Sequence, residues 1–337
     1  MKHVGILVLL TMAVPAHALE KNIGTSAAEF LRLGAGARAL GMGEAYTAVA
    51  EGPDAVYWNP AGLERMDHME AIYTRSELPA GIHHDFLAIG VPSRPLGGTL
   101  AFSVTRLSQE SLILVNASNQ RQGSFSPHSE VYAIAYGHNF IDAAPPVSHH
   151  DEWLLLNHKY ESDRPRRAHI TEGLSVKAIC EDLGTRRAVA FAVDGGGMYK
   201  PSDKLTLAGA FRNLGSKLRF ISESEPLPGE LAAAIAYDTH GKGWRTVYAL
   251  EVDAPYAGRI YGKTGLEISH PVADGMSAAV RFGYSSRSAL DLGALSGATA
   301  GIGLRIGGFK LDAAFEPLGI LGESFRIGVG WAFLLDR

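Results

Sequence analysis

The stretch ESFRIGVGWAF, from Glu323 to Phe333, alternates large apolar side chains with small or polar ones. The apolar positions are Phe325, Ile327, Val329, Trp331 and Phe333. The positions between them are Ser324, Arg326, Gly328, Gly330 and Ala332. Successive side chains of a β-strand point to opposite faces, so this period of two predicts a strand with one apolar and one polar face.

The same alternation recurs in other segments of about ten residues. Clear instances are FKLDAAFE (309–316), ATAGIGLRIGG (298–308), DKLTLAGAFRN (203–213) and GMSAAVRFGYS (275–285). Strands of soluble sandwiches are typically about five to six residues long, whereas a tilted transmembrane strand needs about 9–11. The polar face carries Gly, Ala and Ser with scattered charges, which suits the lining of a narrow, hydrated or plugged barrel. No blade-length repeat indicates a propeller. The pattern favours an all-β transmembrane antiparallel barrel over a soluble secreted β-domain.

The pattern predicts about fourteen wall strands, and bacterial barrels have an even number. They are expected near residues 68–76, 84–92, 98–107, 129–140, 171–182, 186–200, 203–213, 229–238, 243–254, 259–270, 273–285, 296–307, 308–316 and 322–334. Short turns such as KPSD and PVAD are expected on the periplasmic side, with longer connections outside. The connection at 141–170 is long but falls on the periplasmic side. It is either a periplasmic insertion or a missed pair of strands.

The N-terminus predicts a signal peptide over residues 1–18. A short positive start is followed by the apolar run VGILVLLTMAV and by AHA, Ala16 to Ala18, which is a small-x-small cleavage site. Cleavage is expected after Ala18. No later run reaches the 18 apolar residues of a spanning helix. Together with the alternating strands, these features predict a location in the bacterial cell outer membrane.

Bulk properties and motifs exclude several function classes. The net charge is −4 with a pI near 6.4, so there is no electrostatic case for a nucleic-acid partner. Cys180 is the only cysteine, which gives neither a disulfide framework nor a cysteine-based metal site. No GxSxG, HExxH, P-loop or EF-hand pattern occurs. The sequence therefore predicts no catalytic residues and no cofactor.

Two histidine pairs raise the question of a metal site. His83-His84 and His149-His150 are each followed by an aspartate. Neighbouring residues on a strand point to opposite faces, so the first pair is not expected to chelate. The cluster at 149–158 is interpreted as a solvated polar loop, and no metal site is predicted.

Residues 19–67 differ from the rest of the mature chain because they do not alternate and are rich in Gly and Ala. Gly34, Gly36, Gly41 and Gly43 permit close backbone packing or unusual dihedral angles. Their spacing does not fit GxGxxG, and no βαβ context surrounds them. The segment ends with YWNPAG, from Tyr57 to Gly62, in which two rings precede an Asn-Pro turn.

The run FLRLGAGARALGMGEAYTAVAEGPDAVYWNPAGL (30–63) resembles the N-terminal signature of PorV/PorQ-type outer-membrane proteins. These belong to the wider FadL-like superfamily of fourteen-stranded barrels. Residues 59–61 match the NPA motif of the FadL hatch, and residues 204–238 and 301–333 resemble further PorV segments. The resemblance implies an N-terminal hatch or plug (19–67) inside a barrel (68–337). The implied hatch motif comprises Gly34, Gly36, Arg38, Gly41, Gly43, Tyr57, Trp58, Asn59, Pro60, Ala61 and Gly62.

The resemblance implies two non-enzymatic roles. FadL-like members pass hydrophobic small molecules, such as fatty acids, through a plugged barrel. PorV works with a protein secretion system and carries cargo to the cell surface. The expected partners are therefore outer-membrane lipid and either a fatty-acid-like ligand or a secretion-system or secreted cargo protein.

Two local features carry mechanistic expectations. Gly195, Gly196 and Gly197 interrupt an expected strand, where glycine marks a bend, a bulge or close approach of another backbone. We expect them to kink the wall, either to seat the hatch or to open a lateral gate; simple room-making inside the barrel is the alternative. Asn59 is expected to fix its turn through its side chain. Asn59→Ala should then loosen the plug and raise leak.

Overall fold

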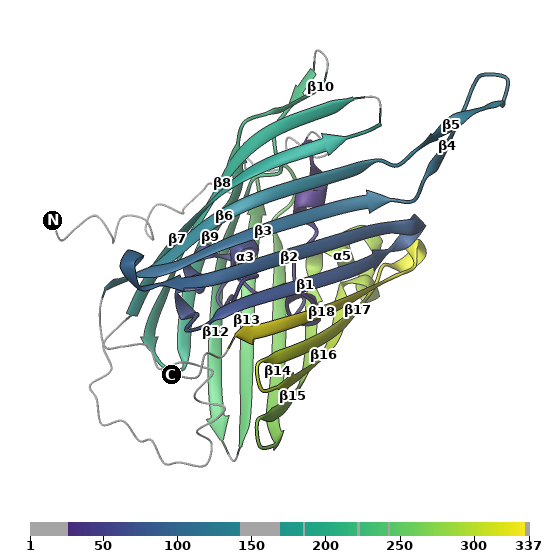
Figure 1. Ribbon diagram of the computed structural model, residues 1–337. Helices are drawn as coiled ribbons and strands as arrows, with labels where there is room; N and C mark the ends of the chain where they lie inside the picture. Colours follow the sequence, from purple (N-terminus) through teal and green to yellow (C-terminus); the bar gives the residue numbers. More distant parts are fainter. Residues whose placement is uncertain (1–25, 142–168, 185, 221–222, 242, 334–337) are drawn as a thin grey trace.

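The computed structural model describes residues 26–141, 169–184, 186–220, 223–241 and 243–333. Fourteen antiparallel strands form one closed barrel (Figure 1). The wall strands are β1 (Met69–Leu78), β2 (Ile82–Ser93), β3 (Gly98–Gln109), β6 (His128–Ile141), β7 (His169–Asp182), β8 (Arg187–Ser202), β9 (Leu205–Gly215), β12 (Glu230–Gly241), β13 (Trp244–Pro255), β14 (Tyr261–Ala273), β15 (Met276–Ser285), β16 (Ala298–Ile306), β17 (Phe309–Pro317) and β18 (Glu323–Phe333). The predicted fold class is confirmed, and each predicted segment overlaps most of one wall strand.

The alternation of side chains separates the two faces of the wall. In β18, Phe325 and Ile327 are 49% and 56% exposed, whereas Arg326 between them is 4% exposed. β18 pairs with β1 from Met69↔Phe333 to Glu77↔Phe325, and this pairing closes the barrel. A shift of one residue would turn every apolar side chain of β18 into the lumen, so the pattern itself fixes the register.

The outside of the barrel is apolar. Exposed outward side chains include Phe191, Ile302, Leu250, Phe282, Ile134 and Trp331. Closing the sheet pairs the backbone groups of every wall strand with a neighbour, as a lipid environment requires. The closed sheet with its apolar outer face is a transmembrane barrel, not a two-sheet sandwich or a propeller. None of the helices in the described ranges combines the length and apolarity needed to cross a bilayer.

The connections differ at the two ends of the barrel. One end carries short turns, such as 203–204, 274–275 and 307–308, and also η5 (Arg94–Leu96). The other end carries η4 (Pro79–Gly81), α5 (Ser286–Leu292), η6 (Ala294–Gly297) and η7 (Gly319–Leu321), together with two small hairpins. The hairpins are β4 (Leu112–Val115) with β5 (Arg121–Phe125), and β10 (Leu218–Phe220) with β11 (Glu223–Glu225). The sequence patterns did not predict these hairpins or α5.

The β4–β5 hairpin projects beyond the neighbouring wall strands (Figure 1). At the short-turn end, β6 and β7 pair directly with each other up to Ile141↔Ile170. The residues between them, 142–168, lie outside the described residues, as do the signal-peptide residues 1–18. The insertion expected at 141–170, the 149–158 cluster and the cleavage after Ala18 therefore remain predictions.

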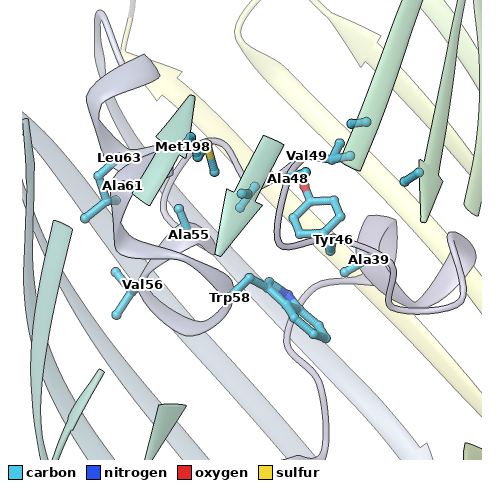
Figure 2. Packing of buried hydrophobic residues seen from close by; sticks show 14 of the residues in the cluster. Ala39, Tyr46, Ala48, Val49, Ala55, Val56, Trp58, Ala61, Leu63 and Met198 are labelled. Atoms are coloured by element: carbon cyan, nitrogen blue, oxygen red, sulfur yellow. The ribbon is translucent and has the colours of Figure 1, made fainter. Parts of the chain in front are cut away.

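Residues 26–66 lie inside the barrel; we call them the inner segment. They form η2 (Glu29–Arg32), α2 (Ala37–Gly41), α3 (Ala55–Trp58) and η3 (Pro60–Arg65). Tyr46, Val56 and Trp58 of this segment belong to one buried cluster with Met198 of β8 (Figure 2). Small inward residues of the wall, such as Ala133 and Ala249, belong to the same cluster. The hydrophobic core of the molecule therefore lies between the inner segment and the inward face of the wall.

Candidate functional site inside the barrel

Three wall glycines lie in a row beneath the Asn59-Pro60-Ala61 turn. Gly137 of β6 pairs with Gly173 of β7, which pairs with Gly196 of β8. Any Cβ atom on Gly137 or Gly173 would overlap Pro60, and one on Gly196 would overlap the Asn59 side chain. The row is a flat backbone surface on which the turn rests.

Asn59 makes three hydrogen bonds at this position and is fully buried. Its Oδ1 accepts from the Ala61 backbone N–H at 3.1 Å, which caps η3. Its Nδ2 donates to the Thr47 carbonyl at 3.1 Å and to the Gly197 carbonyl at 3.4 Å. The side chain thus fixes its own turn, a second part of the inner segment, and the wall.

A second pair of wall glycines lies against the hatch motif at Gly43. Gly265 of β14 pairs with Gly283 of β15, and a Cβ on either would overlap the Met42–Gly43 backbone. Gly43 has φ +63°, a left-handed conformation that favours glycine. Gly41 likewise approaches the backbone of β16. Strands β13, β12 and β9 separate the two glycine surfaces on one side of the barrel.

The two rings of the motif lie in the lumen. Trp58 is 2% exposed, and its Nε1 donates to the Ala35 carbonyl at 2.8 Å. The Arg212 guanidinium and the Lys263 ammonium lie 5.5 and 5.3 Å from the Trp58 ring centroid, within cation–π range. The Tyr57 hydroxyl donates to the Leu31 carbonyl at 2.9 Å. The two rings therefore connect separate parts of the inner segment to each other, and Trp58 also contacts cations of the wall.

Arg38 ties α2 to the wall. Its guanidinium donates to both carboxylate oxygens of Glu267 on β14, each at 2.8 Å, and also pairs with Glu51. Arg281 donates to Glu267 at 2.6 Å and to Asp312 at 2.6 Å. Bidentate arginine–carboxylate pairs are strong and geometrically specific. The chain of charges therefore sets where α2 lies in the lumen.

A second group of wall charges holds the turn at Tyr46–Thr47. Glu251 accepts from the backbone N–H groups of Tyr46 and Thr47 at 2.9 and 2.8 Å. Lys263 donates to Glu251 at 3.3 Å. Arg212 donates to Asp253 at 2.6 Å and to the Trp58 carbonyl at 3.3 Å. The inner face of β9, β13 and β14 thus satisfies polar groups that the inner segment cannot pair itself.

Sequence reasoning did not single out these wall charges. Their signal was present, because Arg212, Glu251, Lys263, Glu267 and Arg281 all occupy inward positions of alternating strands. Charges pointing into a lumen indicate either a wet pore or partners inside it. Only the contacts with the inner segment distinguish the two.

The predicted wall glycines have different surroundings. Gly196 faces the inner segment, whereas a Cβ on Gly195 would meet the Phe211 ring at 2.6 Å and one on Gly197 would have ordinary contacts. β8 runs unbroken from Arg187 to Ser202, and its pairing with β9 shifts register next to Gly195. A gate at this shift stays a prediction, while the contact at Gly196 is consistent with seating the inner segment.

The remaining motif residues also lie in the inner segment. Gly34 packs against Trp58 and Glu44, Gly36 has φ +85° beside Asp54, and Gly62 lies against the Ala50 carbonyl. The His83-His84-Asp85 stretch is split by β2: His84 is buried inside, whereas His83 pairs with Glu77 at 2.6 Å and Asp85 with Arg75 at 3.3 Å. Among the described residues, no group of three or more His, Cys, Asp or Glu side chains is arranged to hold a metal ion.

A small apolar cavity of about 20 Å³ remains between the inner segment and the wall. Phe30, Leu31, Val56 and Tyr57 line it from the inner segment. Phe86, Val131 and Ala133 line it from β2 and β6, with Ser103, Thr105 and Lys177 as its polar members. Lys177 is paired with Asp194 and donates to Asn213 at 2.8 Å, so its charge is already engaged.

The arrangement defines a class: a closed fourteen-stranded transmembrane barrel whose lumen is filled by its own N-terminal segment. No protein-family model matches the sequence, and a comparison with curated proteins gives no match. The solved structure of the toluene transporter TodX of Pseudomonas putida is similar, with a TM-score of 0.56 at 9% identity over 90% of this chain and 99% of that one.

The toluene transporter TbuX of Ralstonia pickettii has a TM-score of 0.51 at 10% identity, over 89% of this chain and 99% of that one. A FadL homologue of Pseudomonas aeruginosa aligns more weakly, with a TM-score of 0.47 at 10% identity over 88% of this chain and 98% of that one. At these identities the likeness to TodX and TbuX shows a shared barrel fold.

Proposed function

We propose that the protein is an outer-membrane channel for small hydrophobic solutes, with residues 19–67 as its hatch. One observation carries the proposal: the described part of that segment fills the lumen but leaves an apolar cavity of about 20 Å³ against the wall, which has room for about one water molecule and must widen to hold a solute. The shared fold with two toluene transporters supports the same class of cargo. The cavity excludes charged solutes, because burying a charge without a partner is costly.

The position of the cavity suits entry from the long-loop end. Ala27 donates its backbone N–H to the Pro226 carbonyl in the loop between β9 and β12, and Arg287 of α5 donates to the Arg32 carbonyl. Phe30 and Leu31 therefore lie below the long loops and form the upper wall of the cavity. Onward passage through the hatch, toward the short-turn end, then requires displacement of the Asn59 turn, which is seated in the closed state.

Uptake of labelled toluene and of a labelled fatty acid into proteoliposomes tests this function. Ala133→Phe fills the cavity from β6 and should reduce uptake about fivefold, which corresponds to the loss of about 1 kcal/mol of apolar burial. Ala178→Phe on the outward face of β7 is the matched control and should keep wild-type uptake. Equal uptake by empty liposomes and wild-type vesicles contradicts the proposal.

A second candidate function is a surface shuttle of the PorV/PorQ type that holds a secreted cargo protein. The observation that favours it is a set of exposed apolar side chains in three connections of the long-loop end, which we call the crest: Leu112, Ile113, Leu114, Val115, Leu295, Ile320 and Leu321. Leu295 and Ile320 are 83% and 97% exposed. Apolar side chains exposed to this degree are candidates for a binding surface.

Outward charges separate this crest from the lipid-facing band on part of the wall. Arg75, Asp85, Arg106 and Glu130 stand side by side on β1, β2, β3 and β6. Such a row belongs at the water-exposed border of the membrane, so the hairpin beyond it extends into water. Ile113→Ser with Leu114→Ser should abolish co-purification of a secreted cargo while leaving solute uptake intact. Retained cargo would remove the crest from this role.

Export and membrane insertion precede either function. Residues 1–18 direct export and are cleaved after Ala18, and the barrel is inserted in the bacterial outer membrane. N-terminal sequencing of the mature protein and its partition with outer-membrane fractions test these two points. The molecule found in the lumen or on the crest of natively purified protein distinguishes the two functions: a lipid-like compound favours the channel, and a bound peptide the shuttle.

A further inference from the structure

Asp54 is a buried carboxyl group that the hatch contacts do not use. It is 8% exposed, and its Oδ1 has no hydrogen-bond partner among the described residues. Asp54 precedes α3 at the N-cap position but makes no capping hydrogen bond. A Cβ on Gly36 would lie 3.0 Å from Asp54 Oδ2, so the inner segment packs tightly on its other side. A buried and unpaired carboxyl oxygen is costly and calls for an explanation.

The side chain lines a polar cavity of about 50 Å³ between the inner segment and the wall at β1 and β16–β18. The volume accommodates a few water molecules. The charged and titratable groups that face it are Arg38 of α2, Tyr46 and Glu51 of the inner segment, Glu70 of β1, Arg305 of β16, and Lys310 and Asp312 of β17. Polar partners on the wall and on the inner segment thus meet at this cavity.

The cations around the cavity are engaged by other carboxylates. Lys310 donates to Glu70 at 2.6 Å, and Arg38 is held by Glu267 at 2.8 Å. Arg305 lies 3.8 Å from Glu51. Asp54 therefore shares a low-dielectric site with Glu51 and Glu70, and it forms no ion pair of its own with the described residues.

The chemistry of the cavity selects its occupant. An anion is disfavoured by the carboxylates, and an apolar molecule would leave the surrounding charges without water. A metal ion is disfavoured because no three His, Cys, Asp or Glu side chains of the described residues are arranged to hold one. The remaining species is a proton, delivered through the water-sized cavity.

The surroundings of Asp54 favour its protonated form. Burial raises the pKa of Asp54 to about 7, and the carboxylates of Glu70 and Glu51 push it upward while Arg38 and Lys310 pull it downward. A carboxyl group that is harder to ionise when buried binds protons more strongly in the seated state. Seating is therefore favoured at low pH, weakens as the pH rises from about 4 to about 7, and is level above that.

We propose that Asp54 is a proton-operated latch that keeps the inner segment seated against β1 and β17 when protonated and loosens it when ionised. Ionisation places a third negative charge beside Glu51 and Glu70, and the charge is relieved when the inner segment moves and water reaches Asp54. The inference goes beyond the proposed channel function and rests on it only for the consequence that a loosened hatch passes solute more readily.

Hydrogen exchange of the full-length protein in liposomes tests the latch without any solute. Protection of the inner-segment amides, corrected for the intrinsic exchange rate, should fall roughly tenfold or more between pH 5 and pH 8 in the wild type. Asp54→Asn, which cannot ionise, should show the same protection at both pH values. Asp274→Asn, in the exposed turn between β14 and β15, is the matched control and should behave as the wild type.

An Asp54→Asn protein that keeps the wild-type fall in protection overturns the proposal. An infrared titration of the wild type covers the case in which that variant does not fold. A carboxyl group that loses its proton between pH 6 and pH 8, and whose infrared band moves in Asp54→Glu, supports the latch, and the absence of one overturns it. Because neither readout involves transport, failure of the latch and failure of the channel function are distinguishable.

Discussion

Gly196 illustrates how single residues set the distance between the inner segment and the wall. The side-chain amide of Asn59 occupies the space where a side chain at this position would lie. That amide forms hydrogen bonds to η3, to Thr47 and to β8. A Cβ atom on the neighbouring Gly197 would lie on the opposite face of the strand, with its nearest contact at 3.5 Å. Two adjacent glycines of one run thus have opposite consequences, because a strand alternates its faces.

At the residue scale we predict that Gly196→Ala displaces the Asn59 turn. The added methyl group overlaps the Asn59 amide, so the turn must move and its hydrogen bonds weaken, each worth about 0.5–1.5 kcal/mol. Conductance of the variant in planar bilayers should exceed the wild-type level. Gly197→Ala adds the same methyl group on the outward face and should leave conductance unchanged. Equal conductance in all three proteins contradicts the seating role.

The strands act as elements that carry two independent sets of residues. Their outward positions face lipid, while their inward positions hold paired charges for the inner segment, as Glu267 of β14 does for Arg38. Buried charge pairs gain little net stability, but removing one partner leaves the other uncompensated. The inward charges therefore select one position of the inner segment more than they strengthen the barrel.

At the element scale we predict that Arg38→Met releases α2. Glu51 and Glu267 lose a buried cation, and breaking such a pair costs about 3–5 kcal/mol. The midpoint of urea-induced exposure of the inner segment in liposomes should fall accordingly. Arg75→Met removes an exposed arginine paired with Glu77 and Asp85, and surface pairs contribute about 0–1 kcal/mol. If both variants lower the midpoint equally, α2 is not held by its buried pair.

The distribution of apolar and charged side chains in the whole molecule is the reverse of that in a soluble protein. The largest exposed apolar side chains cover the outside of the wall, and the charges are buried around the inner segment. This arrangement is stable only where lipid replaces water around the barrel. The long-loop end departs from the pattern, because apolar side chains at the crest lie beyond the wall strands.

At the scale of the whole molecule we predict that Ile302→Arg destabilises the folded barrel in lipid. Ile302 is 62% exposed in the middle of β16, and an arginine facing the bilayer midplane costs about 2–4 kcal/mol. The free energy of unfolding from phosphatidylcholine vesicles measures the effect. Leu295→Arg, placed in a long-end loop, should change it by less than about 0.5 kcal/mol. A cost as large at Leu295 as at Ile302 contradicts the assigned membrane boundary.

The wall was predictable because its signal is local. Each strand declares its two faces within about ten residues, and the register follows from burying one face. The β4–β5 hairpin was missed because its residues LILV do not alternate and are exposed on both sides. The inner segment has no repeating pattern, so its motif residues were predictable only through a resemblance, and their contacts were not.

By itself the sequence determined the fourteen strands, their order in the chain and which side chain of each faces lipid, since these depend on alternation along single segments. The tertiary structure decided what the lumen contains. Only closure of the barrel brings Gly137, Gly173 and Gly196 beneath Asn59, Glu267 to Arg38, and Glu70 near Asp54. These contacts join residues far apart in the chain, and no local pattern encodes a pairing that exists only once the sheet has closed.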